Sequence, residues 1–338
     1  VLTIDASKKC PLSFEDVVSL ENLCEAWREF ISGKRNKKDV QEFQLRLGDE
    51  LSALHLELVS GEYRHGPYQQ FSINDPKPRI IHKASVRDRL LHHAIHRKLY
   101  PFFARAFIAD SFSCQRDKGL HRALRRFRFM ARRVSRNHTR TCWVLKCDIR
   151  KFFASIDHEV LMVILRRRIA DERIIDLLWR VIASFHTDPD KGLPLGNLTS
   201  QLLSNIYLDV FDQFVKHDLH WRFYIRYADD FVFLSDDSRA LEKILFQARD
   251  FLLKSLLLRL HPSKVSIRTI ASGVDFLGWV HFSDHAVLRT KTKRRMLQRI
   301  RVAPHYATLQ SYLGILRHGD AFGLENRLKN DFWLFHDE

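Results

Sequence analysis

The chain has 338 residues, of which 45% are hydrophobic and 28% charged, a balance that suits a globular protein with a sizeable core. Lys and Arg number 56 against 40 Asp and Glu, and the net charge of +16 predicts a polyanionic partner, first of all nucleic acid. Five cysteines without CxxC spacing, no membrane-length apolar run and no signal peptide exclude a disulfide scaffold, a zinc cluster and a membrane protein, so we expect a cytoplasmic location.

The N-terminal half begins with helical patterns. Apolar residues recur at helical spacing over 20–31 and 43–58, and the basic turn 33–38 separates the two runs. A shorter period over 68–81, interrupted by two prolines, predicts an edge hairpin suited to a finger. Helical spacing returns over 86–107.

The segment 118–147 contains no acidic residue, although eight arginines lie within it. Arginines at helical spacing repel one another unless anions lie nearby. A solvated helix face with an apolar stripe is one interpretation. We favour a surface that contacts RNA phosphates, with Arg125, Arg128 and Arg132 on one helical face.

The next part of the chain alternates between strands and helices. A β-rich stretch over 142–148 precedes a helix that begins near Ser155 or Asp157, both suitable N-caps. Thr199-Ser200 is predicted to cap a further helix. Aromatic and β-branched runs over 223–234 predict a hairpin, and a basic helical region follows later.

Three aspartates stand where predicted strands end. Asp229 and Asp230 are adjacent, and their flanks are more apolar than those of an ordinary solvated turn, although a polar hairpin turn is the alternative. Asp148 ends another apolar strand. Three converging carboxylates form an oxygen site suited to Mg²⁺, for which Mn²⁺ can substitute. Two such ions activate a primer 3′-hydroxyl and stabilise pyrophosphate in phosphoryl transfer, which is polymerase chemistry.

Five segments then resemble, in order, the palm motifs of reverse transcriptases: VLKCDIRKFFASIDH, GLPLGNLTSQLLSNIYLDVFDQFV, YIRYADDFVFLS, HPSKVSI and VDFLGW. The resemblance runs from about Phe71 to Trp279. It implies an α+β right-hand polymerase with fingers, a palm containing an antiparallel sheet, and a helical thumb. The expected subdomains are a helical N-terminal extension (1–65), fingers (66–140), a palm (141–280, with finger-like elements at about 158–192) and a thumb (281–338).

The resemblance also assigns roles near the chemistry. Asp148, Asp229 and Asp230 resemble the metal ligands, and the Ile149 carbonyl lies beside the first of them. Lys264 resembles the lysine placed near the leaving pyrophosphate, where it acts as a general acid. A surface lysine is the alternative interpretation.

Further roles concern the nucleotide and the primer. Lys77 and Arg79 fall in a segment similar to the finger that clamps the incoming triphosphate, and Gln201 matches a pocket-lining Ser-Gln element. Phe153 resembles the aromatic gate against the ribose 2′-hydroxyl, with Phe152 as its rival. The primer grip is similar to Phe276-Leu277-Gly278-Trp279.

The form Leu-Gly-x-x-x-Ser-Gln at 195–201 and the opening 21–43 most resemble reverse transcriptases of diversity-generating retroelements. That resemblance implies error-prone copying of a template-repeat RNA with mutagenised adenines, and a small helical accessory protein as partner beside template RNA, primer strand and dNTPs. A stand-alone or antiphage-defence reverse transcriptase is the runner-up. An RNA-binding, maturase-like splicing cofactor is a third interpretation.

One signal is set aside. His92 and His96 have the spacing of a zinc pair, but position 93 is His where a zinc hydrolase needs Glu, and no third ligand suggests itself.

Overall fold

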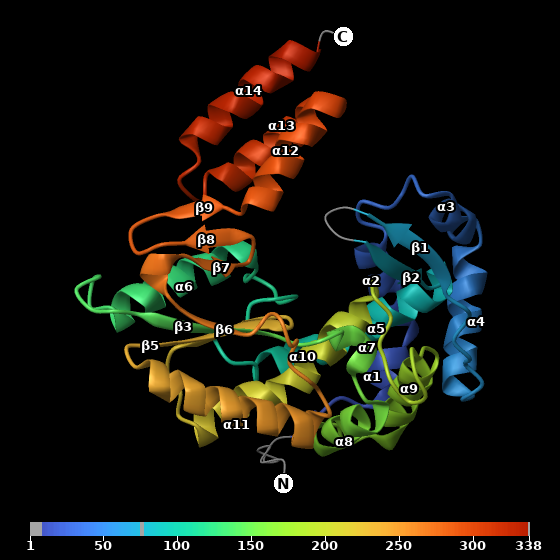
Figure 1. Cartoon of the computed structure of the whole chain (residues 1–338). Helices are drawn as coiled ribbons and strands as arrows, with labels where there is room; N and C mark the ends of the chain where they lie inside the picture. The colour runs from blue at the N-terminus through green and yellow to red at the C-terminus, as the bar shows by residue number, and fades with distance from the viewer. Residues whose placement is uncertain (1–8, 75–77, 337–338) are drawn as a thin grey trace. The chain divides into compact units, whose positions relative to one another are not determined.

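The structure is a computed structural model that describes residues 9–74 and 78–336 (Figure 1). The chain forms two compact units, each built from three separate stretches. Unit 1 contains the residues through Ala109 together with 149–221 and 249–259, and unit 2 contains 110–148, 222–248 and the residues from Leu260 onward. The predicted borders of the four subdomains are a finer division and stay predictions.

Unit 1 is mainly helical. Its central helix is α5, against which α2 and α10 pack. The Ser85 hydroxyl begins α5 by accepting the Asp88 N–H at 3.1 Å. The elements of unit 1 are α1 (Phe14–Val18), α2 (Leu20–Phe30), α3 (Lys38–Leu45), α4 (Leu47–Val59), β1 (Gln69–Ile73), β2 (Arg79–Lys83), α5 (Val86–Ala104), α7 (Phe152–Ser155), α8 (His158–Arg168), α9 (Glu172–Ala183), α10 (Leu198–Gln213) and the π-helical turn η1 (Phe214–Asp218).

Most of the predicted elements of unit 1 are confirmed, and of the two suggested N-caps Asp157 is the residue that caps α8, accepting the Val160 N–H at 3.1 Å. Two predictions differ from the structure. The second predicted helix is broken at Arg46 into α3 and α4. The predicted cap at Thr199-Ser200 is wrong, because α10 begins at Leu198 and both residues lie in its first turn. Asn197 occupies the N-cap position without a capping bond, and its side chain donates to the His82 carbonyl at 3.4 Å.

Unit 2 contains two antiparallel sheets. The larger has the strand order β4-β5-β3-β6. The smaller has the order β7-β8-β9 (Figure 1). Helix α11 (Ser238–Leu256) begins in unit 2 and ends in unit 1. The other elements are α6 (Leu120–Val134), β3 (Trp143–Asp148), β4 (Tyr224–Tyr227), β5 (Asp230–Ser235), β6 (Ser266–Thr269), the 3₁₀ turn η2 (Ile270–Ser272), β7 (Val274–Phe276), β8 (Trp279–His281), β9 (Ala286–Leu288), α12 (Thr290–Val302), α13 (Tyr306–Leu316) and α14 (Phe322–His336).

The core of unit 2 joins both sheets to the helices. Phe127 of α6, Ile225 of β4, Phe276 of β7 and Phe332 of α14 belong to one buried cluster. Helix α6 buries a residue every three or four positions, the spacing of an amphipathic helix, so its arginines are left on the remaining face. Helices α12, α13 and α14 pack against one another and confirm the predicted basic helical region.

Within the part of the chain that the structure describes, no helix is both long and apolar enough to cross a membrane. All five cysteines are free thiols.

Candidate active site

The aspartates lie at one end of the four-stranded sheet. Strand β3 is apolar along most of its length and ends at Asp148, which pairs directly with Asp230, the first residue of β5. Tyr227 of β4 also pairs with Asp230, so Ala228 and Asp229 form the two-residue turn between β4 and β5. Directly opposed residues of antiparallel strands project to the same face. The sequence prediction that these strands bring the carboxylates together therefore agrees with the strand register.

Burial and neighbouring charge act on Asp230. Burial first, then the carboxylates of Asp229 and Asp148, raise the pKa of Asp230 to about 6, although the ammonium groups of Lys146 and Lys264 oppose the shift. Lys146 lies two residues before Asp148 on β3 and hence on the same face of the sheet. Its Nζ also donates to the Asp275 carbonyl at 2.8 Å, which links β3 to β7.

Lys264 contacts the first aspartate directly. Its Nζ donates to Asp148 Oδ1 at 2.8 Å, and the Asp148 side chain is only 11% exposed. The Asp148 carbonyl accepts the His261 N–H at 2.7 Å, so the loop that carries Lys264 is anchored at the same residue. The structure thus brings the predicted lysine to the predicted acid from a distant part of the chain.

Within residues 9–74 and 78–336, no three His, Cys, Asp or Glu side chains converge into a ready metal-binding group. Asp148 is engaged by Lys264, and the three aspartates offer hard oxygen donors of the kind that Mg²⁺ prefers. The chemistry of the donor set fits a divalent cation.

The predicted primer grip is a hairpin between β7 and β8. Phe276 and Trp279 are almost fully buried and form part of the core of unit 2. Leu277 and Gly278 both have positive φ, 52° and 87°, which is the backbone pattern of a tight I′ hairpin turn. A Cβ added at Gly278 would meet nothing within 4 Å, so the glycine is required by its positive φ and not by crowding, and the turn leaves room for a close partner. Only the turn pair is accessible, and the grip stays a prediction.

The described residues of the predicted nucleotide pocket lie in unit 1. Arg79 is exposed on β2, whereas Lys77 lies outside the described residues. Phe152 is buried and Phe153 is half-buried, and the Phe153 carbonyl accepts the Leu193 N–H at 2.8 Å. Gln201 lies half-buried in the first turn of α10.

The β1–β2 hairpin is fixed at its base to the loop before α10. The N–H of His82 donates to the Leu195 carbonyl at 3.0 Å, and the Asn197 amide donates to the His82 carbonyl. The hairpin that carries Arg79 and the helix that carries Gln201 are therefore joined within unit 1.

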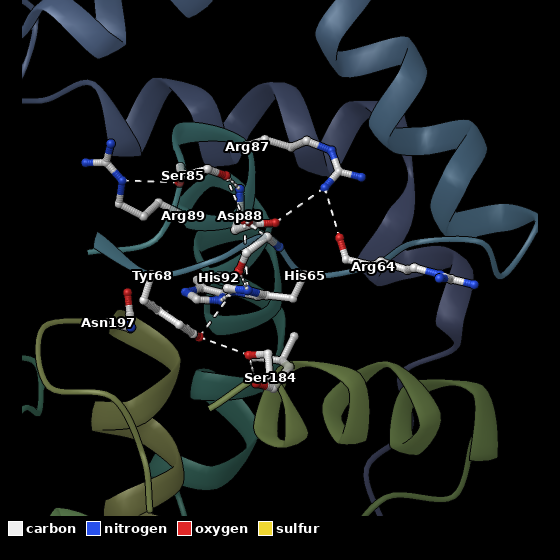
Figure 2. A network of polar contacts seen from close by, with 12 residues as sticks. Arg64, His65, Tyr68, Ser85, Arg87, Asp88, Arg89, His92, Ser184 and Asn197 are labelled. Carbon is white, nitrogen blue, oxygen red and sulfur yellow. Dashed lines mark hydrogen bonds and ion pairs between the residues drawn. The ribbon is translucent and has the colours of Figure 1, made fainter. Parts of the chain in front are cut away.

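A buried polar network joins the segment before β1 to helix α5 (Figure 2). Asp88 of α5 is fully buried and accepts the Tyr63 hydroxyl at 2.8 Å and the Gly66 N–H at 3.1 Å. His65 Nδ1 donates to the Gly66 carbonyl at 2.7 Å, and His65 Nε2 lies 3.2 Å from His92 Nε2. Burial lowers the pKa of His92 to about 3, which keeps this imidazole neutral.

The Tyr68 hydroxyl extends the network to α9, lying 3.2 Å from His65 Nε2 and 3.0 Å from the Ser184 hydroxyl (Figure 2). The two histidines with the spacing of a zinc pair have different neighbours, because His92 faces His65 and the His96 ring stacks on Tyr100.

The arginine-rich helix α6 differs in part from expectation. Arg125 and Arg132 are exposed, but Arg128 is half-buried, and it contributes after burial to lowering the pKa of His281 to about 4. Arg126 is paired with Asp110, its Nε lying 2.7 Å from Oδ1, so one arginine of the acid-free segment has a carboxylate partner outside it. The predicted RNA contacts of the other arginines stay a prediction.

Carboxylates at the end of an antiparallel sheet, with Lys264 Nζ 2.8 Å from Asp148, are an arrangement that suits metal-assisted phosphoryl transfer, as in the palm of a nucleic acid polymerase. Comparison with known proteins specifies the family: residues 73–281 match the family described as "Reverse transcriptase (RNA-dependent DNA polymerase)". The chain belongs to this family and is an enzyme of the RNA-directed DNA polymerase class. The predicted α+β right-hand polymerase fold and the predicted enzyme class are confirmed.

Named relatives support the assignment. The chain is 30% identical over 290 residues to Protein YkfC of Escherichia coli (strain K12), covering 74% of each chain. It is 25% identical over 167 residues to Group II intron-encoded protein LtrA of Lactococcus lactis subsp. cremoris, covering 47% of this chain and 27% of LtrA. It is 24% identical over 160 residues to the Putative COX1/OXI3 intron 2 protein of Saccharomyces cerevisiae, covering 45% of this chain and 17% of that protein.

Among solved structures, apo telomerase from Candida tropicalis matches with a TM-score of 0.49 and 12% identity, over 66% of this chain and 55% of that chain. The chain thus spans about three quarters of YkfC, but about a quarter or less of the two intron-encoded relatives.

Proposed function

We propose that this chain copies an RNA template into DNA, with Asp148, Asp229 and Asp230 holding two Mg²⁺ ions. The observation that carries the proposal is the register Asp148↔Asp230, which sets two carboxylates opposite each other with Asp229 adjacent. Like charges directly opposed on a sheet are destabilising, and the carboxylates of Asp229 and Asp148 add to the effect of burial, which is the main cause of the raised pKa of Asp230. A divalent cation removes the repulsion. Reverse transcriptases as a family use such ions, and Mn²⁺ is expected to substitute.

Bound there, the two cations would activate the primer 3′-hydroxyl and stabilise the pyrophosphate. Residues of the chain would orient the metal ligands and hold a proton near them. Asp148, with the buried Ile149 next to it, and the turn at Asp229 orient the oxygen donors. Lys264, 2.8 Å from Asp148, holds a proton on Nζ close to those donors, which suits the role of general acid toward the leaving group.

Nucleotide selection is proposed for residues of unit 1. The exposed guanidinium of Arg79 can bind a triphosphate in fork geometry, and Lys77 is proposed for the same task. Phe153 is the proposed gate, since it is more accessible than the buried Phe152 and its backbone is fixed by Leu193. Gln201 is proposed to line the pocket.

The proposed subtype is the reverse transcriptase of a diversity-generating retroelement, supported by the Leu-Gly-x-x-x-Ser-Gln sequence at 195–201. Its partners would be template RNA, primer strand, dNTPs and a small helical accessory protein. Sequencing of the cDNA tests the subtype, because errors concentrated at template adenines support it, whereas an even, low error rate points to a stand-alone or antiphage-defence enzyme. A cytoplasmic location is proposed from the five free cysteines.

Primer extension on an RNA template with Mg²⁺ tests the activity, and Asp229→Asn is the decisive variant. Loss of one anionic donor should slow synthesis by at least about 10²- to 10³-fold, while RNA affinity stays nearly unchanged because binding depends on distant phosphate contacts. The matched control is Asp284→Asn, an exposed carboxylate in the same unit that should leave synthesis unchanged. No extension by wild type, or equal loss of synthesis and RNA binding in Asp229→Asn, would contradict the proposal.

A further inference from the structure

Arg226 is a fully buried arginine inside the hairpin that carries the aspartates. It lies on β4, between Ile225 and Tyr227, and its exposed fraction is 0%. A buried guanidinium is costly unless its N–H groups donate hydrogen bonds. One of these bonds reaches the Ala228-Asp229 turn between β4 and β5, because Arg226 Nη1 donates to the Ala228 carbonyl at 3.2 Å.

The backbone of Arg226 is fixed as firmly as its side chain. On one side of β4, Arg226 pairs with Phe231 of β5. On the other side, its N–H donates to the Asp110 carbonyl and its carbonyl accepts the Phe112 N–H, both at 3.0 Å. A parallel bridge at Ser111 completes this edge. The guanidinium therefore extends from an immobilised point of the sheet.

The turn that receives this hydrogen bond has an unfavourable conformation. Ala228 has φ of +53° at the first central position of a two-residue hairpin turn, a position where glycine is preferred. A left-handed conformation is strained for a residue with a Cβ atom, because the Cβ comes too close to the following carbonyl oxygen. Such strain persists where the surroundings fix the conformation, and here it lies directly before Asp229.

We propose that Arg226 is a positioning residue for Asp229 and Asp230. By binding the Ala228 carbonyl, its guanidinium fixes the peptide plane that leads into Asp229 and holds Ala228 at positive φ. This inference rests on the proposed function, in which the two aspartates are metal ligands. Without the hydrogen bond, Ala228 relaxes toward an ordinary conformation and both carboxylates leave their productive positions.

The experiment compares Arg226→Lys, Ala228→Gly and the double variant with wild type. Lysine keeps the charge but lacks the planar fork, so kcat should fall about 10- to 100-fold, the usual effect of losing a group that orients a ligand. The KM for dNTP should stay within about twofold, because no substrate contact is removed. Mn²⁺ binding to the protein without nucleic acid, measured by electron paramagnetic resonance, should weaken by about tenfold.

Ala228→Gly distinguishes a positioning role from a merely structural role of Arg226. Glycine adopts positive φ without strain, so the turn no longer depends on the guanidinium. The double variant should therefore recover most of the kcat and Mn²⁺ affinity lost in Arg226→Lys. The double variant also keeps the test decisive if Arg226→Lys alone fails to fold. A double variant that folds and is active supports the proposal. A double variant that performs no better than Arg226→Lys overturns it.

The matched control is Arg239→Lys, which alters an exposed arginine of α11 in the same unit. Its kcat and Mn²⁺ affinity should equal those of wild type. If Arg226→Lys has the kcat and the Mn²⁺ affinity of wild type, the positioning role of Arg226 is refuted, while the proposed function is unaffected. A wild-type protein that neither binds Mn²⁺ nor extends primers would refute the proposed function itself.

Discussion

Replacing Gly319 by alanine should destabilise the small sheet of unit 2. A Cβ at this position would lie 2.0 Å from Cζ3 of Trp279 and 2.7 Å from the Ala286 carbonyl oxygen, whereas carbon atoms in contact prefer about 3.5–4.0 Å. Trp279 is 2% exposed and cannot swing outward. The carbonyl is equally restrained, because it accepts the Asp320 N–H at 2.8 Å. Two rigid partners must therefore shift.

Overpacking of this kind costs about 1–3 kcal/mol, and we expect the upper part of that range for Gly319→Ala. The matched control is Gly314→Ala in α13, where a Cβ meets nothing within 4 Å and alanine should stabilise the helix by about 0.5–1 kcal/mol. Urea unfolding gives the free energies, and hydrogen exchange of β8 amides locates the change. Equal stability of Gly319→Ala and wild type, or shifts of the same sign in both variants, would refute the reasoning.

Three other outcomes are expected. Phe153→Ala should admit ribonucleotides, because a steric gate works by clash, and an unchanged dNTP preference in single-nucleotide incorporation would remove the gate from this residue. Joint replacement of Arg125, Arg128 and Arg132 by alanine should flatten the plot of log affinity against log salt by about two units, at about 0.7 per phosphate. Filter binding measures this, and a wild-type slope in a folded variant would assign the cluster another role. The free energy of unfolding should fall as the pH drops below the ordinary histidine pKa of 6.5, because unfolded His92 takes up a proton that folded His92, with a pKa of about 3, does not. This contributes about 1.4 kcal/mol per pH unit, so His92→Gln should show a shallower decline between pH 6 and 4, and an identical decline would argue against the assignment.

The local pattern of the sequence was sufficient for the elements that position the acids. Apolar strands ending at Asp148 and flanking Asp229-Asp230 predict carboxylates at strand ends, and the register confirms that Asp148 and Asp230 are opposed. The hairpin β1–β2 and the amphipathic helix α6 were equally visible, because each follows from the spacing of apolar residues within one segment.

Features that depend on distant segments were not visible. Thr199-Ser200 has the composition of a cap, but α10 begins at Leu198 and Asn197 occupies the N-cap position. The bond between Lys264 and Asp148 joins residues 116 positions apart. Arg226 was overlooked inside an aromatic strand, although a charge in such a run was itself a signal of a buried, specific contact.

The interleaving of the two units has a consequence for how the polypeptide is made. Strand β3 lies between β5 and β6, and Lys146 pairs with Val232 on one side and Ser266 on the other. During synthesis β3 leaves the ribosome well before β5 and β6. This apolar strand therefore has two unpaired edges while the unit 1 residues 149–221 are translated. Non-local pairing of this kind folds slowly and exposes the nascent chain to aggregation. Fragments cut between 222–248 and Leu260 would leave β3 unpaired on one edge, and soluble expression should depend on keeping all three stretches of unit 2 together.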